Sequence, residues 1–175
     1  MAFDSGILAA RFATLKVVVV DDEPNMRKVV RTMLLGMTIR AVHEAADGPA
    51  GLELIRTVAP DVVIVDWEMP GLDGGGFVRM VRSPETFPYP TVPIIMLTGH
   101  GERSRVIEAI SIGVNEFLLK PVSAQALHDR IAAVLLKPRP VVRAANYFGP
   151  APRNLAAAVQ ADAATAAPLN LHKRY

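Results

Sequence analysis

Short apolar runs alternate along this chain with segments in which apolar residues recur at helical spacing. Four runs are almost continuously apolar and rich in β-branched or large aliphatic residues: 16–20, 61–65, 92–97 and 116–119. Runs of this length with so few polar positions predict strands that are covered on both faces of a sheet. Residues 39–45 alternate more in polarity and predict a further strand nearer the sheet edge.

The segments between these runs predict helices. In the first of them, Pro24 takes a position that the first turn of a helix tolerates, and apolar residues follow at spacings of three and four. Four more helices are predicted, over residues 48–58, 77–81, 103–112 and 123–136. Residues 83–90 contain three prolines and predict a loop. Five strands alternating with five helices predict an α/β fold, in which right-handed crossovers place helices on both faces of a parallel sheet.

Composition limits the class of protein. The 175 residues allow one domain and an appendage, and 51% hydrophobic with 21% charged residues excludes wholesale disorder. There is no cysteine, which excludes a disulfide framework and a thiolate metal site and agrees with a reducing compartment. No apolar stretch reaches the roughly 18–20 residues that would span a bilayer. A cytoplasmic protein without a membrane partner is therefore expected.

Charge is distributed unevenly. Residues 137–175 contain six basic residues and one acid, a net charge of +5, so residues 1–136 carry −3. We expect an N-terminal extension over 1–15, one domain over 16–136, and over 137–175 a basic tail rich in Ala and Pro that is partly disordered. Within the tail, an Ala-rich helix is predicted from Asn154 to residue 167. Six dispersed charges favour a solvated extension over a nucleic-acid contact.

Polar side chains follow four of the predicted strands. Asp21 and Asp22 come directly after the first apolar run, and Asp66, Thr98 and Lys120 each follow a later one. Because the carboxyl ends of parallel strands meet at one edge of a sheet, where ligands bind in open α/β folds, we expect these side chains to lie close together.

The residue types at this edge indicate a particular chemistry. Three neighbouring carboxylates cannot all stay ionised without a counter-charge, so either a pKa rises or a cation is bound. Oxygen ligands without His or Cys indicate a hard ion such as Mg²⁺. Lys120 adds a fixed positive charge and Thr98 a hydroxyl donor. The combination predicts phosphoryl transfer onto Asp66 to give an aspartyl phosphate. A helix N-cap would explain Asp21 or Asp22 alone, but not the other strand ends.

Four motifs carry a family resemblance. In chain order they are VVVVDDE (17–23), VDWEMPGLDG (65–74), MLTG (96–99) and Lys120-Pro121. With these motifs on these elements, residues 16–136 resemble the receiver domain of bacterial response regulators. The resemblance implies a five-stranded parallel sheet of order 2-1-3-4-5, as in flavodoxin and the chemotaxis receiver, with helices on both faces. It also implies a cis peptide bond between Lys120 and Pro121.

The resemblance assigns roles to matching residues. Asp66 would be the phosphoacceptor, and Lys120 would pair first with Asp66 and then with the phosphoryl group. Mg²⁺ would be held by Asp21, Asp22, Asp66 and the backbone carbonyl of Glu68.

A switch and a set of partners are implied as well. Thr98 would move toward the phosphoryl oxygen, and Phe117 would be the aromatic residue that responds. The implied partners are a sensor histidine kinase or a phosphotransfer protein and a downstream protein target, and a dimer linked to phosphorylation fits the family. The protein is not expected to be an enzyme.

The length of the tail limits how the protein could pass on its signal. Because only 39 residues follow residue 136, too few for an output domain, a stand-alone receiver that signals through protein contacts in a phosphorelay is expected. Residues 141–150 resemble a motif that follows the receiver in some proteobacterial regulators, where Tyr147 and Phe148 pack onto the domain or meet a partner; both alternatives stay open. A transcription regulator that binds DNA through the basic tail is a second hypothesis, although no recognition helix is visible and nucleic acid is not expected as a partner.

A third hypothesis is an aspartate-based phosphohydrolase. Such an enzyme would carry its nucleophile on the first strand with a second Asp two residues later. In this chain, Asp66 lies on the third predicted strand and Glu68 follows it, which disfavours the hydrolase.

Overall fold

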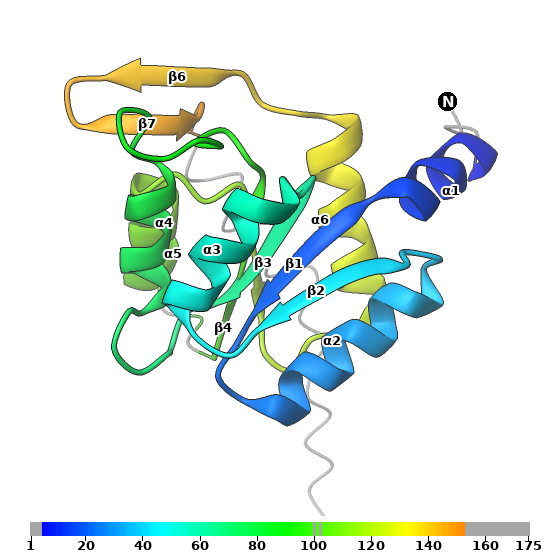
Figure 1. The fold of residues 1–175 in the computed structure, drawn as a ribbon. Coiled ribbons are helices and arrows are strands. Elements are labelled where there is room, and N and C mark those ends of the chain that lie inside the picture. Colours follow the sequence, from blue (N-terminus) through cyan, green and yellow to red (C-terminus); the bar gives the residue numbers. More distant parts are fainter. Residues whose placement is uncertain (1–4, 100, 102, 153–175) are drawn as a thin grey trace, which may run out of the picture.

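The computed structural model describes residues 5–99, 101 and 103–152, so the helix predicted over 154–167 lies outside the described residues. The elements, labelled in Figure 1, are in chain order α1 (Ser5–Thr14), β1 (Lys16–Val20), α2 (Pro24–Gly36), β2 (Ala41–Ala45), α3 (Gly48–Val58), β3 (Val62–Asp66), α4 (Gly74–Val81), β4 (Ile94–Thr98), α5 (Arg103–Ser111), β5 (Glu116–Leu119), α6 (Ala124–Leu136), β6 (Val141–Ala144) and β7 (Tyr147–Pro150).

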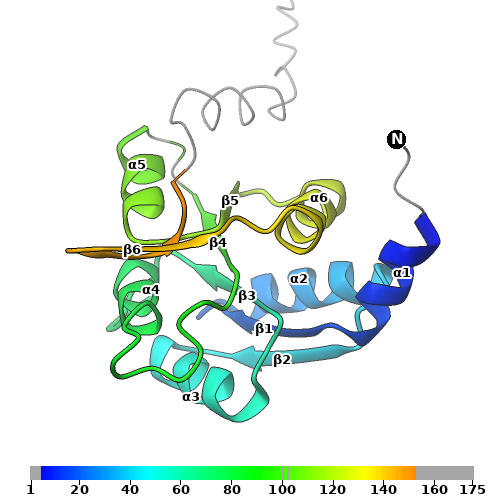
Figure 2. The same ribbon diagram turned by 90° about the horizontal axis from the view of Figure 1, so that it is seen from above.

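Strands β1 to β5 form one parallel sheet in the order β2-β1-β3-β4-β5, which confirms the predicted fold. Figure 2 shows α3, α4 and α5 on one side of this sheet and α1, α2 and α6 on the other. Each side has its own apolar core. Because both faces are covered, the central strand β3 is buried along its whole length, as its continuous apolar run predicts.

The strand and helix ends differ from prediction by a few residues. Strands β3 and β4 extend to include Asp66 and Thr98, so these polar residues are the last residues of their strands. Helix α4 begins at Gly74, three residues earlier than predicted, because the side chain of Asp73 caps it by accepting a hydrogen bond of 2.7 Å from the N–H of Gly76. Among the described residues, no helix combines the length and the apolarity needed to cross a bilayer.

Helix α1 was not predicted from the sequence. It packs against α6, where the ring of Phe12, only 3% exposed, meets the His128 ring edge-on at 5.2 Å between centroids. Arg11 donates a hydrogen bond of 3.3 Å to the carbonyl oxygen of Leu135, near the end of α6. The N-terminal segment therefore extends the core of the α2 and α6 side.

A β-hairpin, also not predicted, follows α6. Strands β6 and β7 pair antiparallel, and β7 lies against Gly113 in the turn between α5 and β5. A Cβ at Gly113 would come within 3.1 Å of the carbonyl oxygen of Phe148. Arg139 joins the hairpin to the domain by donating to the carbonyl oxygens of Ala151, at 2.8 Å, and Asn115. Tyr147 and Phe148 are both half-buried at this junction.

Candidate functional site

The sheet register brings the predicted site residues together. Asp66 ends β3, Asp21 directly follows β1, and the two strands pair with Val20 beside Val65. Thr98 ends the neighbouring strand β4, and Lys120 directly follows β5. Three of these polar side chains are almost inaccessible to solvent: Asp21, Asp66 and Thr98 are 1%, 4% and 5% exposed.

Lys120 lies between two of the carboxylates. Its Nζ is 2.9 Å from Oδ1 of Asp66 and 3.5 Å from Oδ2 of Asp21. Burial raises the pKa of Asp66, the contact with Lys120 opposes this, and the charges of Asp21 and Asp22 raise it further, so the pKa lies above its ordinary value. Burial works to lower the pKa of Lys120, but Asp66 and Asp21 more than offset it and the pKa is raised. Lys120 is therefore a firmly held cation.

The carboxylates also form a candidate metal centre. Asp21, Asp22 and Asp66 each offer an oxygen, and these oxygens lie within 4.8 Å of one another. Oδ2 of Asp21 is buried, and among the described residues its polar contact is the long ion pair of 3.5 Å with Lys120, which does not have hydrogen-bond geometry, whereas Asp22 is exposed. An oxygen-only set with one unsatisfied buried oxygen and one solvent-facing member fits a hard divalent ion that keeps some of its waters. Glu68 is exposed in the loop after β3; a metal contact by its carbonyl remains a prediction.

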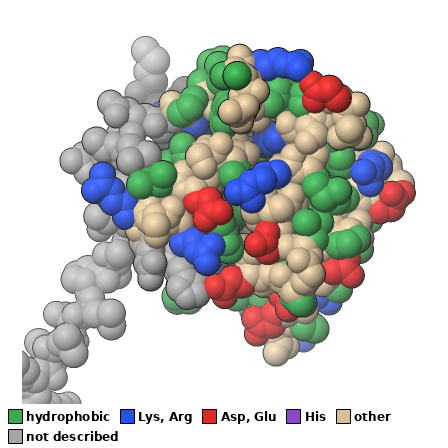
Figure 3. Space-filling model, turned by 90° about the vertical axis from the view of Figure 1, so that its left-hand side faces the viewer, with side chains coloured by type: hydrophobic (Ala, Val, Ile, Leu, Met, Phe, Trp, Pro, Cys, Tyr) green, Lys and Arg blue, Asp and Glu red, His purple; other side chains and the backbone are tan. Residues whose placement is uncertain are grey.

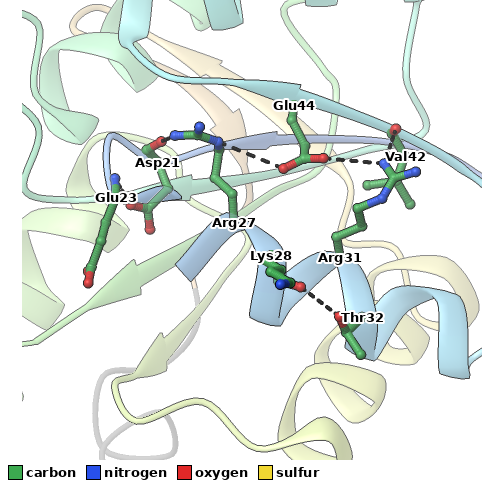
Figure 4. Close-up of polar contacts among 8 residues, drawn as sticks. All are labelled: Asp21, Glu23, Arg27, Lys28, Arg31, Thr32, Val42 and Glu44. Carbon is green, nitrogen blue, oxygen red and sulfur yellow. Dashed lines mark hydrogen bonds and ion pairs between the residues drawn. The ribbon is translucent and has the colours of Figure 1, made fainter. Parts of the chain in front are cut away.

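Asp21 is held in place by residues that the sequence analysis did not identify (Figure 4). Its Oδ1 accepts a 2.8 Å hydrogen bond from the N–H of Glu23. Arg27, on the first turns of α2, donates to the main-chain oxygen of Asp21 at 2.7 Å and forms an ion pair of 3.8 Å with Glu44 of β2. A second ion pair, of 3.3 Å, joins Glu44 to Arg31. These contacts join α2 to β2, so they depend on how the helix packs against the strand and cannot be found from the sequence pattern alone.

The loop after Asp66 is fixed by backbone and aromatic contacts. The N–H of Gly74 donates to the carbonyl oxygen of Trp67 at 2.8 Å, and a Cβ at Gly74 would lie 2.4 Å from the carbonyl oxygen of Asp66. Trp67 is 4% exposed, and the guanidinium of Arg105 lies 5.1 Å from the centre of its ring. The neighbour of the candidate phosphoacceptor is thus joined to α5.

The expected switch residues lie on adjacent strands. The carbonyl oxygen of Thr98 accepts a 2.8 Å hydrogen bond from the N–H of Lys120. Phe117 pairs with Met96 in the sheet register and packs, half-buried, against the core on the α3, α4 and α5 side. The peptide bond between Lys120 and Pro121 is cis, as predicted. The switching motion of Thr98 and Phe117 stays a prediction.

Known proteins are similar to this chain in sequence and in fold. Residues 17–132 match the response regulator receiver domain family. The chemotaxis protein CheY of Pseudomonas aeruginosa is 32% identical over 120 residues, which are 69% of this chain and 95% of that protein. The chemotaxis protein CheY1 of Helicobacter pylori is 36% identical over 122 residues, 69% of this chain and 97% of that protein.

Solved structures agree with these matches. The chemotaxis protein CheY4 of Vibrio cholerae has a TM-score of 0.63 and 32% identity, over 69% of this chain and 98% of its own. The receiver domain of the Francisella response regulator 1452 has a TM-score of 0.62 and 27% identity, over 72% and 100%. The region that matches the family contains β2 to β5, all but the first residue of β1, and the acidic pocket formed by Asp21, Asp22 and Asp66 with Lys120. The chain belongs to the response regulator receiver domain family of two-component signalling proteins.

Proposed function

We propose that Asp66 accepts a phosphoryl group from a sensor histidine kinase or a phosphotransfer protein, and that the phosphorylated chain signals by contact with a downstream protein. One observation carries the proposal. A lysine amine lies 2.9 Å from a buried carboxylate that shares its pocket with two further carboxylates. This pocket combines a nucleophile, a fixed cation and a set of oxygen ligands for a metal, which are the components that phosphoryl transfer requires.

Each residue of the site has a separate role in the proposed phosphoryl transfer. A carboxylate oxygen of Asp66 attacks phosphorus, the bond from phosphorus to the donor's imidazole nitrogen breaks, and its electron pair stays on the imidazole. Lys120 then stabilises negative charge on the transferred oxygens, and the Thr98 hydroxyl donates to one of them. Asp21, Asp22, Asp66 and the carbonyl of Glu68 would hold Mg²⁺, which supplies further neutralisation of the phosphoryl oxygens.

Mass spectrometry of the intact chain tests the acceptor. With acetyl phosphate and Mg²⁺, the wild-type chain is expected to gain the mass of one phosphoryl group, and the Asp66→Asn chain to gain none. Asp129→Asn is the matched control because Asp129 is an exposed carboxylate on α6, outside the pocket. Equal labelling of wild type and Asp66→Asn would refute the assignment.

The described part of the tail gives no support to the DNA-binding hypothesis. Arg139 donates to main-chain oxygens of the domain, and Arg143 pairs with Glu85. On the face seen in Figure 3, acidic and basic side chains are interspersed, without a broad patch of one sign. A groove or stripe of positive charge is the usual feature of a nucleic-acid surface.

A further inference from the structure

The outer edge of β6 is open to solvent. The N–H of Ala151 donates to the carbonyl oxygen of Pro140 at 2.8 Å, so residues 140 and 151 are a hydrogen-bonded pair of the hairpin. Hydrogen-bonded and non-hydrogen-bonded pairs alternate in an antiparallel ladder, which makes Val142 with Gly149 the next bonded pair. Val141 and Arg143 therefore direct their N–H and C=O groups away from β7.

These outward groups are uncovered and lie beside apolar side chains. Figure 1 shows β6 as the outer strand of the hairpin. All four of its residues are exposed, with Val141 at 45% and Val142 at 36%. Within residues 5–99, 101 and 103–152, only β7 pairs with β6. Isolated two-stranded ribbons are marginally stable in water, and an exposed apolar edge strand recruits another strand.

We propose that a second copy of this chain pairs with β6 by antiparallel strand addition, with a two-fold axis at Val142. The Val142 side chains of the two copies would then lie side by side as a non-hydrogen-bonded pair. Val141 of each copy would face Arg143 of the other, and each such pair would exchange two main-chain hydrogen bonds. The product is a four-stranded antiparallel sheet with an isologous interface.

Charge and chain geometry select this register. A two-fold axis at Arg143 would place two guanidinium groups directly opposite each other, which is destabilising. An axis at Val141 would bring Arg139 into the paired segment, but Arg139 is held against the domain by Asn115 and Ala151. With the axis at Val142, an apolar residue faces Arg143, whose charge is already paired with Glu85 in its own chain.

The proposed contact is small. Two four-residue strands bury less than the roughly 1,200 Å² of a stable interface, so we expect a weak dimer whose population rises with protein concentration. Sedimentation equilibrium of the full chain should fit a monomer and dimer in exchange.

A single introduced thiol tests the register, because the chain has no cysteine of its own. Across the axis, the two Cα atoms at position 142 would lie about 4.5 Å apart, within reach of a disulfide. Under mild oxidation, the Val142→Cys chain is expected to form a covalent dimer at least about tenfold faster than Ala144→Cys, since pairing raises the effective thiol concentration. Ala144 is a matched control: it is exposed on the same strand, but its two copies would be about 13 Å apart along the sheet.

A variant that lacks one main-chain N–H distinguishes strand pairing from nonspecific association through the exposed apolar side chains. In the Val142→Cys chain, adding Arg143→Pro removes the outward N–H and leaves the β6–β7 bonds in place, so cross-linking should fall to the Ala144→Cys rate. Adding Arg143→Ala removes the same ion pair but keeps the N–H, so cross-linking should persist. Equal cross-linking rates for Val142→Cys and Ala144→Cys would overturn the proposal, as would a chain that stays monomeric at every concentration.

Discussion

Lys120 is one cation beside three carboxylates, Asp21, Asp22 and Asp66. Without it, the buried carboxylates would lose their compensating charge in this pocket. In the presence of a chelator, Lys120→Met should therefore lower the free energy of unfolding by about 3 kcal/mol. Mg²⁺ should restore more stability to this variant than to wild type, because the ion replaces the lost charge and binds the folded state alone.

Urea unfolding with chelator and with Mg²⁺ measures both effects. Asp22→Asn is the control for the metal: Asp22 is exposed, so the variant should stay folded but lose the stabilisation by Mg²⁺. A wild-type unfolding midpoint that does not respond to Mg²⁺ would count against the metal centre.

Gly74 tests how tightly the loop after Asp66 is packed. A methyl group at this position would lie 2.4 Å from the carbonyl oxygen of Asp66 and 2.8 Å from Cα of Trp67, both of them backbone atoms. Gly74→Ala is therefore expected to destabilise the fold by about 1–3 kcal/mol, despite the better helix propensity of Ala. Gly36→Ala is the control, because a methyl group there would have no other atom within 4 Å and helix propensity should stabilise that variant. Thermal unfolding of the two variants would show opposite shifts.

The role of a single residue can be predicted from the sequence where the residue stands at the end of an apolar run. Asp66, Thr98 and Lys120 can be identified because each ends or directly follows an apolar run, and the parallel register then brings these strand ends to one edge of the sheet. Arg27 and Arg82 do not stand at the end of an apolar run, so no sequence pattern indicates their roles. Arg82 is 6% exposed and donates to the carbonyl oxygens of Pro90 and Val92, in the loop before β4, and of Gly113, after α5. Its role depends on tertiary contacts that periodicity does not encode.

At the scale of elements, α1 extends the folded unit beyond the predicted start of the domain. Phe12 is 3% exposed and packs in the same core as α2 and α6. Phe12→Ala should therefore lower the free energy of unfolding by about 3 kcal/mol. Ile7→Ala, at a position that is 61% exposed on the same helix, should change it little. If chemical denaturation gave equal midpoints for the Phe12→Ala chain and wild type, α1 would be an appendage rather than part of the core.

Helix α1 and the β6–β7 hairpin, the two elements that were not predicted, differ in how strongly the sequence indicates them. Leu8, Phe12 and Leu15 recur at spacings of four and three, so α1 has a helical signal that could have been found. The hairpin has little signal. Its strands have four residues each, and Ala145-Asn146 connects them without the glycine that marks a tight hairpin turn. Its place depends on contacts with Gly113 and Asn115, which are distant in the chain.

Over the whole molecule, the acidic pocket and the hairpin lie at opposite ends of α5. Near the pocket, Arg105 of α5 lies over the ring of Trp67. At the far end, Gly113 contacts the main chain of Phe148 in β7. Helix α5 therefore connects the candidate phosphoacceptor with the segment that follows the receiver.

Phosphorylation should be sensed along this connection. The phosphoryl group would add about −1.5 to −2 charges beside Thr98 and Lys120. We expect Phe117 to respond by taking a second position, which would turn this local change into a second arrangement of the strand. With beryllofluoride as the phosphoryl mimic, hydrogen exchange is expected to change over α5, β5 and α6, the surface where a partner would detect the signal. The Asp66→Asn chain should show no such change. A response confined to the residues around Asp21, Asp22 and Asp66, with α5, β5 and α6 unaffected, would mean that the signal leaves the pocket by another route.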